Sequence, residues 1–329
     1  MTAEITVELP TETVGENMLS KENYDLIVNR LSKQSVDKHF EAYIDVPWDE
    51  EGMEIDVNDE RLECWKIDPV RYSKWYQNQT VEVRRRIALA RIASIMRTGW
   101  EFENLLQRGL LAHAFRLPNQ SSEFRYIHHE VIEESHHSMM FQEFVNRSNI
   151  DVAGMPKYLK WLAEKVVLPI QGFAPQLFFF FVLGGEDPID YMQRQQLKEN
   201  AGHPIVNRIM KIHVTEEARH ISFARNSLRH DVPRMNKVEK FVLSILVPIL
   251  MAIMVRLMVF PSFKFIRDNK IPFSVYREII RSDEANDLIR DATAKPRKLA
   301  RELGLMNKAS EGLWKLGKMY DKKDDFKRV

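Results

Sequence analysis

The chain has 329 residues, 44% of them hydrophobic and 29% charged, and its 48 basic side chains nearly balance 47 acidic ones. The net charge of +1 argues against a protein that binds nucleic acid through bulk positive charge. Cys64 is the single cysteine, which excludes an intramolecular disulfide and a multi-cysteine zinc site within one chain. The first residues lack a signal-peptide pattern, and we expect a cytoplasmic protein.

The pattern of apolar residues predicts a helical protein. Glycine and proline are few, 12 and 14 residues, so tight turns should be rare. From Val81 onward, apolar residues recur at helical spacing in long segments separated by short breaks. A short helix is expected over Asn23–Ser35, followed by four long ones over Val81–Phe115, Ser122–Asn146, Pro156–Glu186 and Pro204–His230.

These helices are expected to form one domain over residues 21–310. Its core is a four-helix bundle, with additional N-terminal and C-terminal helices, the latter near 238–260 and within 274–303. Residues 1–20 are expected to be a flexible arm and residues 311–329 a charged, solvated tail. Strand-like alternation is scarce, so the sequence predicts an all-α fold.

One segment is apolar enough to raise the question of a membrane. Phe241–Val255 carries no charge, and the apolar stretch continues past Arg256 to Phe260, a length near that of a membrane-spanning helix. Pro248 lies at its middle, and the buried helix of a large all-helical domain has a similar composition. We interpret the segment as a core helix and keep peripheral membrane contact and a spanning helix as alternatives.

The strongest chemical signal is a repeated Glu-x-x-His motif, Glu134-Ser-His-His137 and Glu217-Ala-Arg-His220. Residues three apart lie about 60° apart around a helix, so each motif presents a carboxylate beside an imidazole. Di-iron and di-manganese sites in helix bundles take one such pair from each of two helices and a single glutamate from each of the other two. A lone motif arises by chance in many helices, whereas two copies predict such a metal site.

Helix faces suggest further ligands. His213 shares a sector of about 60° with Glu217 and His220, so three ligand-type side chains lie on one stripe. On the first long helix Glu101 shares a polar face with two arginines, whereas Glu103 lies on the apolar face and is the better ligand.

Glu186 is the candidate from the third long helix, where it follows an apolar run. Pro188 removes a backbone donor, so we expect a kink or a new helix start at Glu186, and further kinks at Gly172 and Pro175. Several remaining side chains near the motifs are interpreted as a solvated surface: His128, His129, His136 and Glu216.

Charge balance favours a metal centre over four separate glutamates. Burying an unpaired carboxylate costs several kcal/mol, and close carboxylates raise one another's pKa. Two divalent ions would balance four carboxylates and leave the imidazoles neutral, and this ligand set suits iron or manganese. In the alternative, the helix faces do not converge and each glutamate pairs with an arginine or lysine.

The ligand pattern resembles the p-aminobenzoate N-oxygenase family of di-iron enzymes. The resemblance rests on His213-x-x-x-Glu217-x-x-His220, on Glu186 27 residues before His213, and on Glu134-Ser-x-His137 upstream. The third histidine, His213, distinguishes this family from typical ferritin-like sites. The resemblance covers about residues 81–303 and implies a ferritin-like bundle with seven metal ligands: Glu103, Glu134, His137, Glu186, His213, Glu217 and His220.

The resemblance also implies an oxygenase. Two iron ions, with manganese as the alternative, would react with dioxygen and oxidise a small organic substrate by arylamine N-oxygenation. Electrons would come from an external reductase, because the sequence has no Gly-x-Gly-x-x-Gly fingerprint. Leu288-Ile-Arg290-Asp291 is similar to a family segment whose arginine can bind a substrate carboxylate. A homodimer is implied as well.

Other functions stay open at this point. The apolar segment near 238–260 makes a di-iron hydroxylase or desaturase of a lipid-like substrate an alternative. A non-enzymatic, ferritin-like iron-binding protein is another, although it would need neither His213 nor the additional C-terminal helices. A metal-free helical interaction protein is the third.

Overall fold

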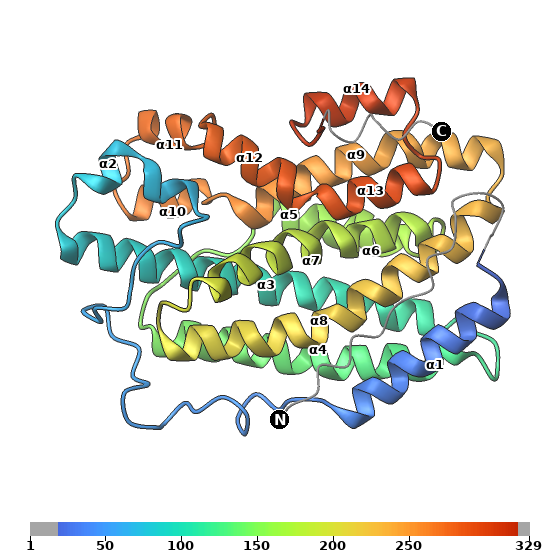
Figure 1. Cartoon of the computed structure of the whole chain (residues 1–329), viewed down its shortest axis with the longest axis horizontal. Coiled ribbons are helices and arrows are strands. Elements are labelled where there is room, and N and C mark those ends of the chain that lie inside the picture. The colour runs from blue at the N-terminus through green and yellow to red at the C-terminus, as the bar shows by residue number, and fades with distance from the viewer. Residues whose placement is uncertain (1–18, 322–329) are drawn as a thin grey trace.

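Four long helices pack into a bundle in the computed structural model, which describes residues 19–321 (Figure 1). α3 (Val81–Ala114) packs along α4 (Ser122–Arg147), and α7 (Pro175–Lys198) packs along α8 (Pro204–Asp231). α4 also contacts α8 and α3 contacts α7, so the four helices enclose a common core. The described residues contain helices and no strand, which confirms the predicted all-α fold with a four-helix core.

Shorter helices cover the outside of the bundle. α1 (Lys21–Asp37) lies against α4 and α8, and α9 (Lys237–Val259) lies against α7. The remaining elements are η1 (Pro69–Tyr72), α2 (Lys74–Gln77), α5 (Lys157–Leu162), η2 (Ala163–Val167), α6 (Leu168–Ile170), η3 (Val232–Arg234), α10 (Phe263–Asp268), α11 (Phe273–Ile279), α12 (Asp283–Ala292), α13 (Ala294–Glu302) and α14 (Lys308–Leu316).

Local capping signals fix where three bundle helices begin. The side chain of Thr80 accepts a hydrogen bond from the backbone of Val83, and that of Ser121 from the backbone of Glu123. α8 begins with Pro204. Proline lacks a backbone N–H, but at the first position of a helix this group would have no hydrogen-bond partner within the helix. These helices begin where the sequence predicts.

The third bundle helix differs from its prediction. The expected helix over Pro156–Glu186 is interrupted at residues 171–174, and α7 begins at Pro175 and continues to Lys198. Glu186 therefore lies in the middle of a helix, and the expected new helix start at this residue is wrong. Pro188 lies inside α7, where it removes one bond of the helical ladder while the flanking turns continue.

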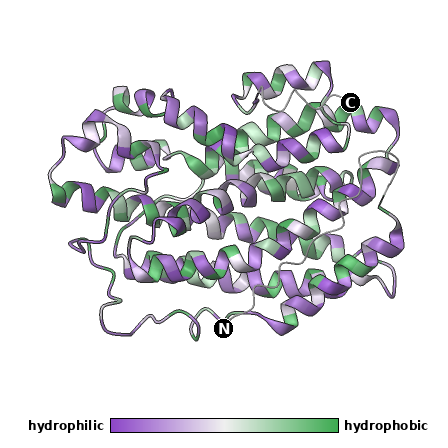
Figure 2. Cartoon of the chain, viewed as in Figure 1, coloured by the Kyte–Doolittle hydropathy of each residue, from purple (hydrophilic) through white to green (hydrophobic). Residues whose placement is uncertain are grey.

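The apolar segment is one helix, α9, with two different faces. Its inner face, which includes Val247, Met251 and Val255, is buried, and α9 packs against α7 and α14. Its outer face exposes Leu246 and Ile249 to about 40%, and Figure 2 shows the helix as mostly hydrophobic. Residues 237–268 are long and apolar enough to cross a membrane by length and composition, and half of the most apolar window is buried.

The C-terminal boundary was predicted too early. Trp314 and Met319 are fully buried, and α14 packs on α9, so the domain continues beyond residue 310. Charged residues dominate the sequence of this end, but apolar residues at its start reach the core. Residues 1–18 of the expected flexible arm and 322–329 of the expected tail lie outside the described residues.

Candidate metal centre

Seven buried side chains from all four bundle helices converge at one point. Their ligand atoms form three overlapping groups, and within each group the atoms lie within 4.8 Å of one another. None of the seven residues is more than 2% exposed. They are Glu103 on α3, Glu134 and His137 on α4, Glu186 on α7, and His213, Glu217 and His220 on α8. The structure thus brings together the seven residues that the sequence selected.

Of the two candidate glutamates on α3, Glu103 lies in the cluster and Glu101 does not, as the polarity of the helix faces predicts. Glu103 faces Nε2 of His213 at 3.4 Å, within the cluster. Glu101 is buried too, which the sequence did not predict, but it turns away from the cluster. It accepts a hydrogen bond from the backbone of Met155 at 2.7 Å and pairs with Lys160 at 2.6 Å.

The chemistry of the cluster fits metal binding. Oε2 of Glu103, Oε1 of Glu186 and Oε2 of Glu217 are buried and have no hydrogen-bond partner among the described residues. No lysine or arginine of the described chain forms an ion pair with any of the four glutamates. Glu103, Glu134 and Glu217 instead lie beside the three histidines. The alternative in which each glutamate pairs with a basic side chain is therefore wrong.

The histidines turn suitable nitrogens toward the cluster. Nδ1 of His137 lies 3.1 Å from Glu134 and 3.3 Å from Glu217, and Nδ1 of His220 lies 2.9 Å from Glu134. Burial lowers the pKa of His213 to about 4. Its imidazole is therefore neutral near pH 7, which is the form that binds a metal ion.

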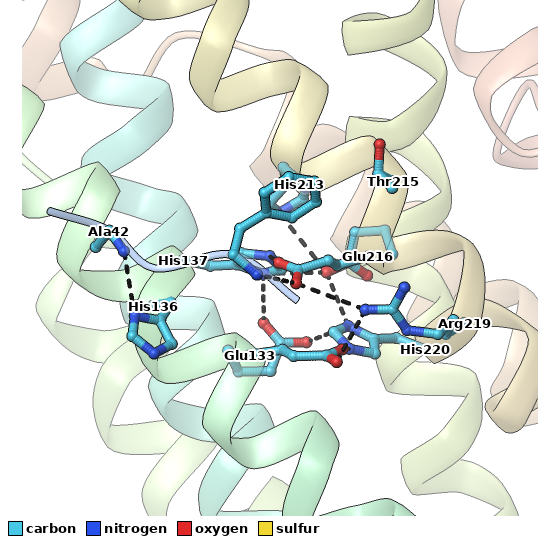
Figure 3. A network of polar contacts seen from close by, with 12 residues as sticks. Ala42, Glu133, His136, His137, His213, Thr215, Glu216, Arg219 and His220 are labelled. Carbon is cyan, nitrogen blue, oxygen red and sulfur yellow. Dashed lines mark hydrogen bonds and ion pairs between the residues drawn. The ribbon is translucent and has the colours of Figure 1, made fainter. Parts of the chain in front are cut away.

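Two further glutamates accept hydrogen bonds from His137 and His220 on the side of each ring that faces away from the cluster (Figure 3). Nε2 of His137 donates to Glu216 on α8 at 2.9 Å, and Nε2 of His220 donates to Glu133 on α4 at 2.7 Å. Each motif is therefore Glu-Glu-x-x-His, and its first glutamate accepts a hydrogen bond from the histidine of the other motif. Arg219 lies between the two carboxylates, 2.8 Å from Glu133 and 3.5 Å from Glu216.

This arrangement corrects the prediction for Glu216. The sequence placed Glu216 at the surface, but it is fully buried, because the segment after α1 covers it and the backbone of Phe40 donates to it at 3.1 Å. His136 is partly buried, as its ring accepts a hydrogen bond from the backbone of Ala42 at 3.2 Å. His136 remains outside the cluster, as predicted, and His128 and His129 are also only partly buried.

Comparison with known proteins gives the family. The family model described as P-aminobenzoate N-oxygenase AurF matches residues 21–304, most of the chain. The chain belongs to this family. Two similar proteins are the uncharacterized protein Rv0885 of Mycobacterium tuberculosis and the uncharacterized protein Mb0909 of Mycobacterium bovis. Each is 40% identical over 291 residues, which cover 88% of this chain and 85% of the relative.

A narrow apolar cavity adjoins the centre of this AurF-family protein. Glu103, Glu186 and His213 form its wall on the side of the ligand cluster, and aromatic and methionine side chains form half of the other lining residues. Arg290 does not line it. Arg290 lies on α12, where it pairs with Asp287 at 2.7 Å and with Asp291 at 3.2 Å, so this geometry gives no support to its expected role as a carboxylate ligand.

Removing the metal should make the stability of the protein depend on pH. Burial and neighbouring carboxylates raise the pKa of Glu103 and Glu186 well above the usual value, and burial raises that of Glu130 to about 8. The folded, metal-free protein therefore holds a proton on Glu130 up to about pH 8 that the unfolded chain has lost, and the raised pKa values of Glu103 and Glu186 act in the same direction. Its free energy of unfolding should fall as pH rises, by about 1.4 kcal/mol per pH unit for each such proton.

Urea unfolding of metal-free and metal-loaded protein at pH 6.5 and 8 measures this effect. The metal-loaded protein should lack most of the dependence, because bound ions replace the protons. If the free energy of unfolding depended equally on pH in both forms, this prediction would be wrong.

Proposed function

We propose that this protein is an oxygenase that uses dioxygen at a di-iron centre held by the seven converging residues. The observation that supports this most directly is a group of four buried carboxylates, three of them with an unpaired oxygen, that have no lysine or arginine partner in the described chain. Two divalent ions would balance their charge. When bound, the ions would supply the electrons and open coordination positions that dioxygen needs.

The two sides of the centre have different roles in this proposal. Glu133, Glu216 and Arg219 close the side behind His137 and His220, and they orient these two rings. The opposite side opens to the apolar cavity. The substrate would therefore approach from the side of Glu103, Glu186 and His213, in a space that excludes most water.

Iron, rather than manganese, is the proposed metal because the chain belongs to the AurF family. The further partners in the proposal are an external electron donor and a second copy of the chain in a homodimer. The exposed apolar face of α9 is the part of the described surface where peripheral membrane contact would occur. A cytoplasmic location stays a prediction.

Oxygen consumption tests the proposed reaction. The iron-loaded, chemically reduced protein should consume dioxygen faster with an oxidisable organic compound, and product should form in proportion. An arylamine should be N-oxygenated, whereas hydroxylation or desaturation of a fatty acid would favour the alternative lipid-directed enzyme. Uptake of many iron ions per chain without substrate oxidation would contradict an oxygenase and favour an iron store.

The third histidine offers a matched pair of variants. His213→Ala should lower metal affinity by about 10- to 100-fold or more, since it removes a direct ligand. His136→Ala should leave the metal content unchanged, because His136 contacts the backbone of Ala42 and not the cluster. Metal titration of both variants measures this. Loss of metal in His136→Ala alone would show that the ligand assignment on α4 and α8 is wrong.

A further inference from the structure

The cavity beside the metal centre contains one polar group that the proposed centre does not use. Gln193 on α7 lines this cavity and is 5% exposed. Its Oε1 is buried and has no hydrogen-bond partner among the described residues. An unpaired buried acceptor costs about 1–3 kcal/mol, so this amide oxygen is suited to accept a hydrogen bond from a molecule that enters the cavity.

Helix geometry separates Gln193 from the candidate metal ligand Glu186 along α7. Glu186, Ile189 and Gln193 line the same cavity from one face of α7, and Gln193 follows Glu186 by seven residues. Two helical turns correspond to about 10 Å along the axis. A molecule with one end near Glu186 and the other at Gln193 would be roughly one ring long, with a substituent at each end.

The rest of the cavity wall is apolar or carries carboxylates. None of its lining residues in the described chain is a lysine or arginine. A substrate carboxylate at the Gln193 end would lose its water shell without gaining a cation, which is costly. The wall includes Met96, Met210 and Met258, whose unbranched side chains can shift to admit a ring into the narrow space.

We propose that Gln193 binds the distal polar group of the substrate, and that this substrate is neutral and largely apolar, with a hydrogen-bond donor such as an amide, hydroxyl or amine at that end. The proposal rests on the proposed oxygenase function and specifies its substrate class. The proposed substrate therefore differs from p-aminobenzoate, the compound in the family's description, because it carries no carboxylate at this end.

Two probes of nearly equal shape and different charge test this, 4-aminobenzamide and 4-aminobenzoate. Their dissociation constants are measured by calorimetric titration into the full-length protein, both anaerobically loaded with iron and without added metal. Wild type should bind 4-aminobenzamide at least about tenfold more tightly than 4-aminobenzoate. Equal or tighter binding of 4-aminobenzoate, or no binding of either, would overturn the proposal.

Variants at Gln193 assign the effect to this side chain. Gln193→Leu should weaken binding of 4-aminobenzamide about tenfold, yet leave the thermal midpoint unchanged or higher, because it removes an unpaired buried amide. Gln193→Arg should reverse the preference toward 4-aminobenzoate. Gln195→Leu, on the same helix but outside this cavity, is the control and should bind like wild type. Unchanged binding in Gln193→Leu would overturn the role of Gln193.

Iron content is measured in the same samples, which keeps the two hypotheses separate. Two bound irons with a preference for 4-aminobenzoate would leave the oxygenase proposal standing and overturn the neutral substrate. Absence of bound iron would contradict the oxygenase, while the titrations without metal would still decide the role of Gln193.

Discussion

Replacing Glu217 with alanine is expected to abolish binding of both metal ions. Glu217 belongs to two of the three groups of ligand atoms, and it lies 3.0 Å from His220 and 3.3 Å from His137. Its removal takes away a carboxylate that two of these groups share and that would help to hold both ions. Anaerobic iron loading followed by elemental analysis should give less than about 0.5 iron per chain, against about two for wild type.

Glu101→Gln is the matched control for this variant. Glu101 is a buried glutamate on a bundle helix, but it pairs with Lys160 and not with the cluster. The control should lose some stability and keep its iron. Circular dichroism establishes that both variants are folded, and a full iron complement in folded Glu217→Ala would contradict the ligand assignment.

Replacing Arg219 with leucine is expected to destabilise the protein by about 3–5 kcal/mol. Arg219 is buried and is the only basic side chain of the described chain that pairs with Glu133 and Glu216, apart from the two histidines. Without Arg219, the carboxylates of Glu133 and Glu216 stay buried, and the two histidines are their remaining ion-pair partners in the described chain. Urea unfolding measures the loss, and weaker iron binding should accompany it because both rings lose orientation.

Arg229→Leu provides the comparison on the same helix. Arg229 pairs with Glu302 at 2.6 Å, and both side chains are more than a third exposed, so water screens the pair. Its loss should cost at most about 1 kcal/mol. If Arg219→Leu were no more harmful than Arg229→Leu, the network behind the histidines would have no stabilising role.

Periodicity and motif spacing were sufficient to predict much of the site. Glu134, His137, Glu217 and His220 occur in repeated motifs whose geometry depends only on a local helix, and His213 follows from the same face of α8. Glu103 was distinguished from Glu101 by the polarity of its neighbours along one helix. These inferences need only the 3.6-residue period, which tertiary contacts did not change here.

What the sequence did not predict depends on contacts between distant segments. Glu216 is buried because Phe40, far away in sequence, covers it, and no pattern within α8 reveals that contact. Trp314 reaches the core from a segment that is mostly charged. The continuation of α7 through Pro188 likewise reflects packing of the helix against α8 and α9, which overrides a local signal for a break.

Four carboxylates meet in one buried site, and we propose that two metal ions neutralise them there. Elemental analysis of the purified wild-type protein after anaerobic iron loading and removal of free metal tests it most directly. We expect about two iron ions per chain. A folded protein that retains less than about 0.5 iron per chain, and is as stable without the metal as with it, would contradict the claim.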